Sequence, residues 1–209
     1  MRIGVLGTGD VGKAFANGML LLGHDVMLGG REAAGEHAAR WSAAAGPRAS
    51  HGAFADVAKY GEMLFLATHG MAAEAALALA GPPNFAGKIL VDATNPLEGV
   101  PPSLAIVGND SLGERVQKLL PEAKVVKAFN TVGNTLFVHP KLSSKPDMFI
   151  AGNDDAAKAE VAKLCEDWSW GVIDLGGIES ARLCEALAMV WITNGFHNNA
   201  WSVAFKMIS

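Results

Sequence analysis

The sequence predicts an α/β protein built on a doubly wound, mostly parallel β-sheet of the Rossmann type. Short apolar runs alternate with segments of helical periodicity from the first residue onward, which is the pattern of strand–helix–strand units. A glycine-rich loop follows the first apolar run and opens a helix. Half of the 209 residues are hydrophobic and 18% are charged, which is enough apolar material for a sizeable core.

The expected strands are apolar throughout, because parallel strands covered by helices are buried on both faces. Strands are predicted at residues 3–6, 25–28, 49–53, 63–67, 89–92, 125–128, 147–151 and 172–174. Helices are predicted at residues 12–22, 32–45, 54–59, 71–80, 111–120, 154–168 and from 179 to about 206. The proline-rich stretch around residues 101–102 is expected to be a surface loop.

Local signals set several of the helix ends. Gly23 is expected to end the first helix, since glycine tolerates the left-handed conformation that follows a helix. Gly46-Pro47 and Gly81-Pro82-Pro83 are helix-breaking sequences after the second and fourth helices. Ser111 and Glu114 have the spacing of a capping box, in which each side chain accepts a hydrogen bond from the backbone N–H of the other residue.

Two parts of the chain are expected. Residues 1–146 are predicted to form a dinucleotide-binding Rossmann domain, and residues 147–209 a small α/β extension that ends in a long helix. The extension is expected to contribute to dimerisation, because a long apolar helix needs a partner surface.

The glycine-rich loop Gly7-Thr8-Gly9-Asp10-Val11-Gly12 has the context as well as the spacing of a dinucleotide-binding loop. The first glycine allows a tight turn, the second lets the pyrophosphate approach the backbone, and the third lets the helix pack on the strand. The helix N-terminus adds free N–H groups and a positive dipole end. Asp10 either caps this helix or orders the loop. We therefore predict a bound dinucleotide rather than a glycine-rich turn without a ligand.

The end of the second strand predicts which dinucleotide binds. NAD-binding proteins usually carry Asp or Glu there, to bind the ribose 2′-hydroxyl. Here Gly29, Gly30 and Arg31 follow the strand, so a glycine and a permanently charged guanidinium replace the acidic group. NADP(H) is therefore favoured over NAD(H). Alternatively, Arg31 is a solvent-exposed helix-start residue, and the neighbouring Glu32 repels a phosphate or holds Arg31 in place.

Composition argues against several kinds of partner. The net charge of −4 and the scattered charges, with no basic stripe, argue against nucleic acid. Cys165 and Cys184 are expected to be buried free thiols rather than a disulfide or a zinc site, so no metal is expected. No signal-peptide core and no membrane-length apolar stretch is visible, so we expect a cytoplasmic protein without a membrane partner.

Several segments together resemble a known family. They run in order over nearly the whole chain, at residues 7–13, 28–31, 91–96, 125–131, 149–154 and 174–182. Through them the chain resembles the NADP oxidoreductases that depend on coenzyme F420, an 8-hydroxy-5-deazaflavin. It also resembles the cytosolic oxidoreductase domain of the six-transmembrane metalloreductases. The family usually has serine where Gly30 stands, so one potential hydrogen bond to a 2′-phosphate is missing here.

The resemblance implies a homodimer and a site at the carboxyl ends of the strands. Together, the glycine loop and the resemblance place the following residues against NADP(H): Gly7, Thr8, Gly9, Asp10, Val11, Gly12, Gly30, Arg31, Thr68, His69, Asn95, Pro96, Ala128 and Asn130. The implied reaction moves hydride between nicotinamide C4 and deazaflavin C5. The protein then has to orient the two rings and exclude water.

The candidates for a catalytic role are His69, Asn130 and Asn134. His69 is either a general acid or, as we favour, a loop histidine that hydrogen-bonds cofactor or backbone, because the implied reaction needs no acid. The two asparagines, with Asn95 and His139, polarise a carbonyl, bind an acceptor or are turn residues. A polar group near the C-terminus either lines the acceptor pocket or belongs to a dimer interface or solvated face. It comprises Asn194, His197, Asn198, Asn199 and Trp201.

The predicted function is hydride transfer between NADP(H) and a deazaflavin or flavin. One alternative is an NADPH-dependent reductase of a small imine, a carbonyl or a ferric substrate. Imine reductases need a second, mostly helical domain, for which the residues after Ala151 are few. A further alternative is a non-catalytic NADPH-binding sensor or partner protein. No flavin-binding motif is visible, so the identity of the acceptor stays open.

Overall fold

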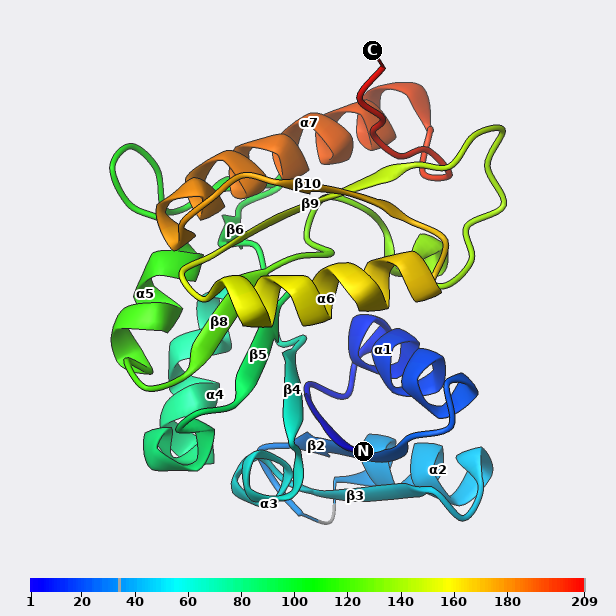
Figure 1. Cartoon of the computed structure of the whole chain (residues 1–209), viewed down its shortest axis with the longest axis vertical. Coiled ribbons are helices and arrows are strands. Elements are labelled where there is room, and N and C mark those ends of the chain that lie inside the picture. The colour runs from blue at the N-terminus through cyan, green and yellow to red at the C-terminus, as the bar shows by residue number, and fades with distance from the viewer. Residues whose placement is uncertain (34, 209) are drawn as a thin grey trace.

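The computed structural model describes residues 1–33 and 35–208, and it confirms the predicted fold class (Figure 1). Its centre is an eight-stranded sheet in the order β10-β9-β8-β5-β4-β1-β2-β3, in which only the β8–β9 pair is antiparallel. The strands are β1 (Arg2–Leu6), β2 (Asp25–Gly30), β3 (Ala49–Ala53), β4 (Met63–Leu66), β5 (Ile89–Asp92), β8 (Lys124–Lys127), β9 (Asp147–Gly152) and β10 (Gly171–Asp174).

Helices cover both faces of the sheet. The α-helices are α1 (Asp10–Leu21), α2 (Glu36–Ala45), α3 (Phe54–Tyr60), α4 (Ala73–Ala80), α5 (Leu112–Leu119), α6 (Asp155–Asp167) and α7 (Ala181–Asn198). Short 3₁₀ helices are η1 (Gly70–Ala72), η2 (Pro82–Phe85), η3 (Asn134–Leu136) and η4 (Ile178–Ser180). Helices α1 and α6 bury Phe15 and Val161 in one core, while α3, α4 and α5 bury Val57, Leu77 and Val116 in the other.

Successive strand residues point into opposite cores, which explains why the strands are apolar throughout. In β5, Leu90 belongs to the core under α3, α4 and α5, and Val91 belongs to the core under α1 and α6. In β8, Val125 and Val126 alternate in the same way. This two-sided burial fixes the register of the sheet, because a slip of one residue would exchange the two cores.

The topology places the candidate site at one edge of the sheet. Strands β1, β4, β5 and β8 are parallel neighbours, so the loops that follow them emerge at the same edge (Figure 1). The chain runs outward from β1 to β2 and β3 and then crosses back to β4 on the other side of β1. Ligands of open α/β sheets bind at such a switch point, outside the carboxyl ends of the strands.

Two boundaries near this edge differ from the prediction. Strand β2 continues to Gly30 rather than ending at residue 28, because Gly29 and Gly30 still pair with β3. Helix α2 begins at Glu36 rather than at residue 32, and Gly35 occupies its N-cap position. Residues 31–33 form a bend between them, and the predicted helical residue 34 lies outside the described residues. The later start follows from Gly35, since glycine favours the end of a helix over its interior.

The predicted helix from 179 to about 206 was wrong in its second half. Helix α7 ends at Asn198, and Asn199 has a left-handed conformation with φ of 51°. The chain then folds back: a Cβ on Gly195 would lie 2.3 Å from the ring of Trp201, and the backbone N–H of Asp147 donates to Phe205 O at 2.9 Å. The terminal segment therefore covers the start of β9, a tertiary contact that apolar periodicity alone does not reveal.

Smaller differences have local reasons. The Ser111 hydroxyl accepts from the N–H of Glu114 as predicted, but the reverse half of the capping box is absent, because the N–H of Ser111 donates to Asp110. The expected helix 71–80 starts as the 3₁₀ turn η1. A short hairpin that was not predicted, β6 (Leu97–Glu98) with β7 (Ser103–Leu104), flanks the loop expected around residues 101–102.

Candidate functional site

The three glycines of the loop after β1 have different surroundings. Gly7 has φ of +130°, and a Cβ there would lie 2.3 Å from Ala67 O. A Cβ on Gly12 would lie 1.9 Å from Gly7 O. Gly9 occupies the N-cap of α1, and a Cβ there would meet no atom within 4 Å. The outer glycines thus allow close packing of loop, helix and sheet, while Gly9 leaves an open surface at a helix N-terminus.

Asp10 does not cap α1, because the N-cap position belongs to Gly9 and Asp10 is the first helical residue. Its carboxylate lies 3.9 Å from the Lys13 ammonium, one turn further along. A carboxylate in the first turn is stabilised by the positive end of the helix dipole. The predicted capping role is therefore wrong, and the position of Asp10 fits a third role, in which its charge stabilises the start of α1.

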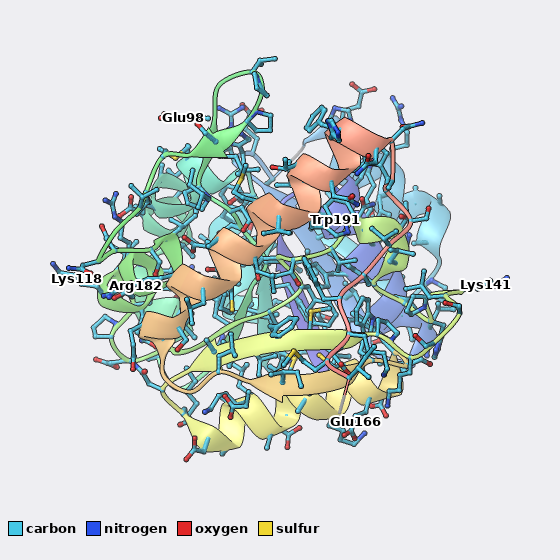
Figure 2. The ribbon with its side chains drawn as sticks, turned by 90° about the horizontal axis from the view of Figure 1, so that it is seen from above. Glu98, Lys118, Lys141, Glu166, Arg182 and Trp191 are labelled. Carbon is cyan, nitrogen blue, oxygen red and sulfur yellow. The ribbon has the colours of Figure 1, made fainter. Side chains whose placement is uncertain are left out.

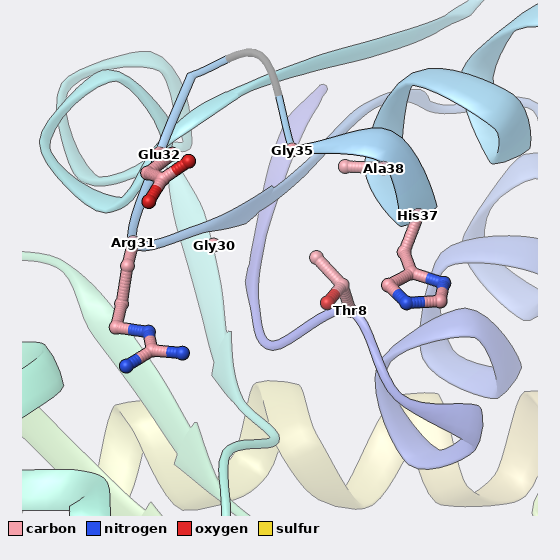
Figure 3. Close-up of a pocket in the computed structure, with 7 residues that line it drawn as sticks. All are labelled: Thr8, Gly30, Arg31, Glu32, Gly35, His37 and Ala38. Atoms are coloured by element: carbon pink, nitrogen blue, oxygen red, sulfur yellow. The ribbon is translucent and has the colours of Figure 1, made fainter.

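A pocket lies beside this loop (Figure 3). It is lined by Thr8, Gly30, Arg31, Glu32, Gly35, His37 and Ala38. Thr8, Gly30 and Arg31 were predicted as cofactor-binding residues, and the structure brings all three to the same pocket. Sequence reasoning missed Gly35, His37 and Ala38, because it began the second helix too early. Recognition of Gly35 as a helix N-cap would have placed His37 in the first turn of α2.

The predicted residues at the ends of β4, β5 and β8 also converge. Asn95 Nδ2 donates to the backbone oxygen of Asn130 at 2.8 Å, and Asn130 Nδ2 donates to Asn95 Oδ1 at 2.9 Å. A Cβ on Gly70 would lie 1.9 Å from Asn95 O, so the turn after Thr68 and His69 packs directly on this pair. His69 is exposed there.

Two buried polar atoms at this edge lack a hydrogen-bond partner among the described residues. They are Thr68 Oγ1 and Asn130 Oδ1. The amide nitrogen of Asn130 is already used twice, since it also donates to Cys184 O at 2.9 Å. Most buried polar groups in folded proteins are paired, and an unpaired one costs free energy. These two acceptors are therefore suited to a polar ligand group with N–H donors.

A buried ion cluster lies directly beneath these residues, and sequence reasoning did not identify it. The Lys127 ammonium lies 3.0 Å from Asp92 and 2.9 Å from Glu185, and all three side chains are almost fully buried. Asp92 also accepts from the backbone N–H and the hydroxyl of Thr94. Glu185 accepts from the N–H groups of Leu112 and Gly113 at the start of α5. The cluster thus joins β5, β8, α5 and α7.

The charges in this cluster depend on each other. Burial alone would lower the pKa of Lys127, but the carboxylates of Asp92 and Glu185 outweigh burial, so its pKa lies above the ordinary value. The second carboxylate is balanced by the N-terminus of α5, whose N–H groups carry partial positive charge. The sequence did carry a signal for this cluster, because Asp92 and Lys127 each end an apolar strand. Charged residues are seldom buried without a partner, so the two could have been predicted to pair.

Two further predicted residues, Asn134 and His139, lie in the segment between β8 and β9. Asn134 begins η3, and the ring of His139 lies 2.9 Å from the hydroxyl of Ser169, next to the end of α6. The polar residues of α7 form a separate surface hollow, in which Asn194, His197 and Asn198 lie beside Met189, Val190 and Thr193. Trp201 packs on the rings of Trp191 and Phe196. Seen from above, α7 runs across the face of the molecule (Figure 2).

Both cysteines are free and buried, as predicted. Burial raises the pKa of Cys184 to about 12, and burial also raises the pKa of Cys165. The thiolate is the reactive form of cysteine, so neither thiol is suited to nucleophilic chemistry at neutral pH. Within residues 1–33 and 35–208, no group of three or more His, Cys, Asp and Glu side chains is arranged to hold a metal ion. No helix in the same ranges is long and apolar enough to cross a membrane.

Comparison with known proteins agrees with this geometry. The family model described as "NADP oxidoreductase coenzyme F420-dependent" matches residues 2–96, which include the glycine loop and the pocket beside it. A crystal structure from Arthrobacter sp. FB24, named provisionally as an F420-dependent NADP reductase, is 43% identical over the full length of both chains, with a TM-score of 0.93. The chain belongs to the F420-dependent NADP oxidoreductase family. The resemblance seen in the sequence is thereby confirmed.

Curated members of the F420-dependent NADP oxidoreductase family and its relatives are more distant. The F420-dependent NADP reductase of Methanothermobacter marburgensis is 28% identical, over 99% of this chain and 98% of that protein. Metalloreductase STEAP3 of Rattus norvegicus is 27% identical over 90% of this chain, which spans only 36% of that protein. The similarity to the metalloreductase therefore concerns one part of a longer protein.

Proposed function

We propose that this chain is an NADPH-dependent oxidoreductase that transfers hydride between NADP(H) and a deazaflavin or flavin acceptor. The observation that carries the proposal is the pocket at the end of β2. There Arg31 shares the lining with Thr8 of the glycine loop, and no carboxylate occupies the last strand position. Such a pocket has room and charge for the 2′-phosphate that distinguishes NADP from NAD.

The residues present fit the rest of the cofactor. The open surface at Gly9 and the N-terminus of α1 would hold the pyrophosphate. Thr68 Oγ1 and Asn130 Oδ1 would accept hydrogen bonds from the nicotinamide carboxamide, which supplies the N–H donors that both buried oxygens lack. Asn95 would hold Asn130 in place through the paired amides. NADPH supplies the hydride when it is bound, and these residues orient it.

The buried charges at this edge support an acceptor that needs no protein acid. Asp92 and Lys127 end β5 and β8, but they are fully buried and paired, so neither can exchange a proton with a substrate. His69 is exposed and stays a candidate hydrogen-bond donor to the cofactor. A deazaflavin or flavin ring delocalises the charge that hydride transfer creates. A simple imine or carbonyl instead takes the hydride at carbon and needs a proton on its nitrogen or oxygen.

Replacing Arg31 with alanine is expected to weaken NADPH binding by about 30-fold, the size of one charged hydrogen bond, and to leave NADH binding nearly unchanged. Titration of both cofactors by fluorescence measures this. Arg115→Ala is the matched control, because Arg115 is an exposed arginine on α5, outside the pocket. Equal affinities of the unaltered protein for NADPH and NADH would contradict the NADP assignment.

An acceptor screen tests the proposed reaction. NADPH oxidation is followed by absorbance with coenzyme F420, FMN, FAD, a ferric chelate and a small cyclic imine in turn. Turnover is expected with a deazaflavin or flavin. Turnover with only the imine or only the ferric chelate would replace the proposal by the corresponding reductase. Tight NADPH binding without turnover of any acceptor would instead favour a non-catalytic NADPH-binding protein.

We further propose a cytoplasmic homodimer in which residues 147–209 contribute to the acceptor side and to the interface. Leu183, Val190 and Phe196 are exposed apolar side chains along α7, and this pattern supports a second copy as the covering surface. Sedimentation equilibrium of the whole chain tests the dimer. A monomer at micromolar concentration would refute it.

A further inference from the structure

The pocket beside the glycine loop is built by three separate segments. Thr8 comes from the loop after β1, Gly30, Arg31 and Glu32 come from the end of β2 and the bend after it, and Gly35, His37 and Ala38 come from the start of α2. In the view of Figure 3, Arg31 and His37 lie on opposite sides of Thr8. Both side chains belong to exposed residues, so a ligand can reach them from solvent.

A phosphate bound in this pocket would need donors besides Arg31, and His37 can provide one. A phosphate monoester carries about −1.5 to −2 charges at pH 7. The positive charge of Arg31 is offset by the carboxylate of Glu32 in the same lining. His37 is a further lining side chain, and its ring provides an N–H donor for a phosphate oxygen.

The exposed charges next to His37 do not compete for it. On α2, Glu36 forms an ion pair with Arg40, so this carboxylate already has a partner. Gly30 presents no side chain to the pocket, and a Cβ there would meet Thr8 Cγ2 at 3.4 Å. Residue 30 therefore provides no side-chain donor for a phosphate, and the donors must come from the other residues that line the pocket.

We infer that His37 is a specificity-determining residue, which binds the adenosine 2′-phosphate of NADP(H) together with Arg31 and Thr8. The inference rests on the proposed NADP(H) site and adds to it a second side chain with N–H donors, contributed by the first turn of α2. It also explains how the chain retains a phosphate site although Gly30 provides no side-chain donor.

The role of His37 in phosphate binding can be tested without catalysis, by measuring the binding of two fragments of the cofactor. The affinities of 2′,5′-ADP and 5′-AMP are measured by calorimetry on the whole chain, since the two ligands differ only in the 2′-phosphate. His37→Gln is expected to weaken 2′,5′-ADP binding by roughly 10-fold and to leave 5′-AMP binding unchanged. His37→Arg is expected to restore the affinity for 2′,5′-ADP. His51→Gln, on β3 outside the pocket, is the matched control and is expected to change neither affinity.

The possible failures are distinguishable. If His37→Gln weakens the binding of 2′,5′-ADP and 5′-AMP equally, His37 contacts the adenosine and the inference is overturned. Unchanged affinity for both ligands would overturn it as well. If the unaltered chain binds 2′,5′-ADP no better than 5′-AMP, the proposed NADP(H) site itself fails, and the inference fails with it. Because His37 is exposed, thermal unfolding of the variants should match that of the unaltered chain.

Discussion

Replacing Lys127 with methionine is expected to lower the free energy of unfolding by about 3–5 kcal/mol, the usual cost of breaking a buried ion pair from one side. Methionine fits the length of the lysine stem, so the loss comes from charge rather than shape. In the unaltered chain the Lys127 ammonium lies 3.0 Å from Asp92 and 2.9 Å from Glu185. In the variant both carboxylates would remain buried without this cation. Urea unfolding followed by tryptophan fluorescence measures the change, because Trp168 and Trp170 are buried.

Lys118→Met is the matched control for this experiment, since Lys118 is an exposed lysine on α5. Its free energy of unfolding should change by no more than about 0.5 kcal/mol. A loss below about 1 kcal/mol in Lys127→Met would contradict the argument, because it would mean that the two carboxylates take up protons or reach water at little cost.

Replacing Gly9 with alanine is expected to weaken NADPH binding by about 100-fold or more while the fold remains intact. Gly9 has φ of −76° and ψ of −174°, which alanine adopts without strain, and no protein atom lies within 4 Å of the added methyl. Stability should fall by less than about 1 kcal/mol, since alanine is a poorer N-cap residue than glycine. The methyl would occupy the surface that the pyrophosphate needs.

Gly12→Ala provides the contrast. Its Cβ would lie 1.9 Å from Gly7 O, a distance that backbone atoms cannot relieve without moving the loop. Stability should therefore fall in this variant, and binding with it. Isothermal titration with NADPH and thermal unfolding of both variants separate the two effects. Unchanged NADPH affinity in Gly9→Ala would show that the cofactor does not approach the backbone at this glycine.

The sequence predicted best what is encoded by neighbouring residues. Gly7, Gly9 and Gly12 have the spacing of a phosphate-binding turn, and each performs a different steric role in the structure. Arg31 lies in the pocket beside this loop, and its role in binding a 2′-phosphate stays a prediction. The order of strands and helices was predicted because periodicity is a property of each segment by itself.

Boundaries were less predictable where a distant contact decides them. The apolar pattern of the last helix continues beyond Asn198, yet the chain turns back there, because Trp201 packs on Gly195 and the terminal segment bonds to Asp147. At the start of α2, Gly35 ends the bend, but the pairing of Gly29 and Gly30 with β3 sets where that bend begins. Neither contact can be predicted from the spacing of apolar residues within the segment.

By itself, then, the sequence determined the Rossmann-type fold, the glycine loop and the position of Arg31, because each depends on a few adjacent residues. Only the tertiary structure decided that His37 shares a pocket with Arg31, that Asn95 pairs with Asn130, and that Lys127 meets Glu185. These partners are brought together by the sheet order and by the packing of helices on it. Distance along the chain gives no measure of such proximity, since parallel strands align their carboxyl ends whatever the length of the crossover between them.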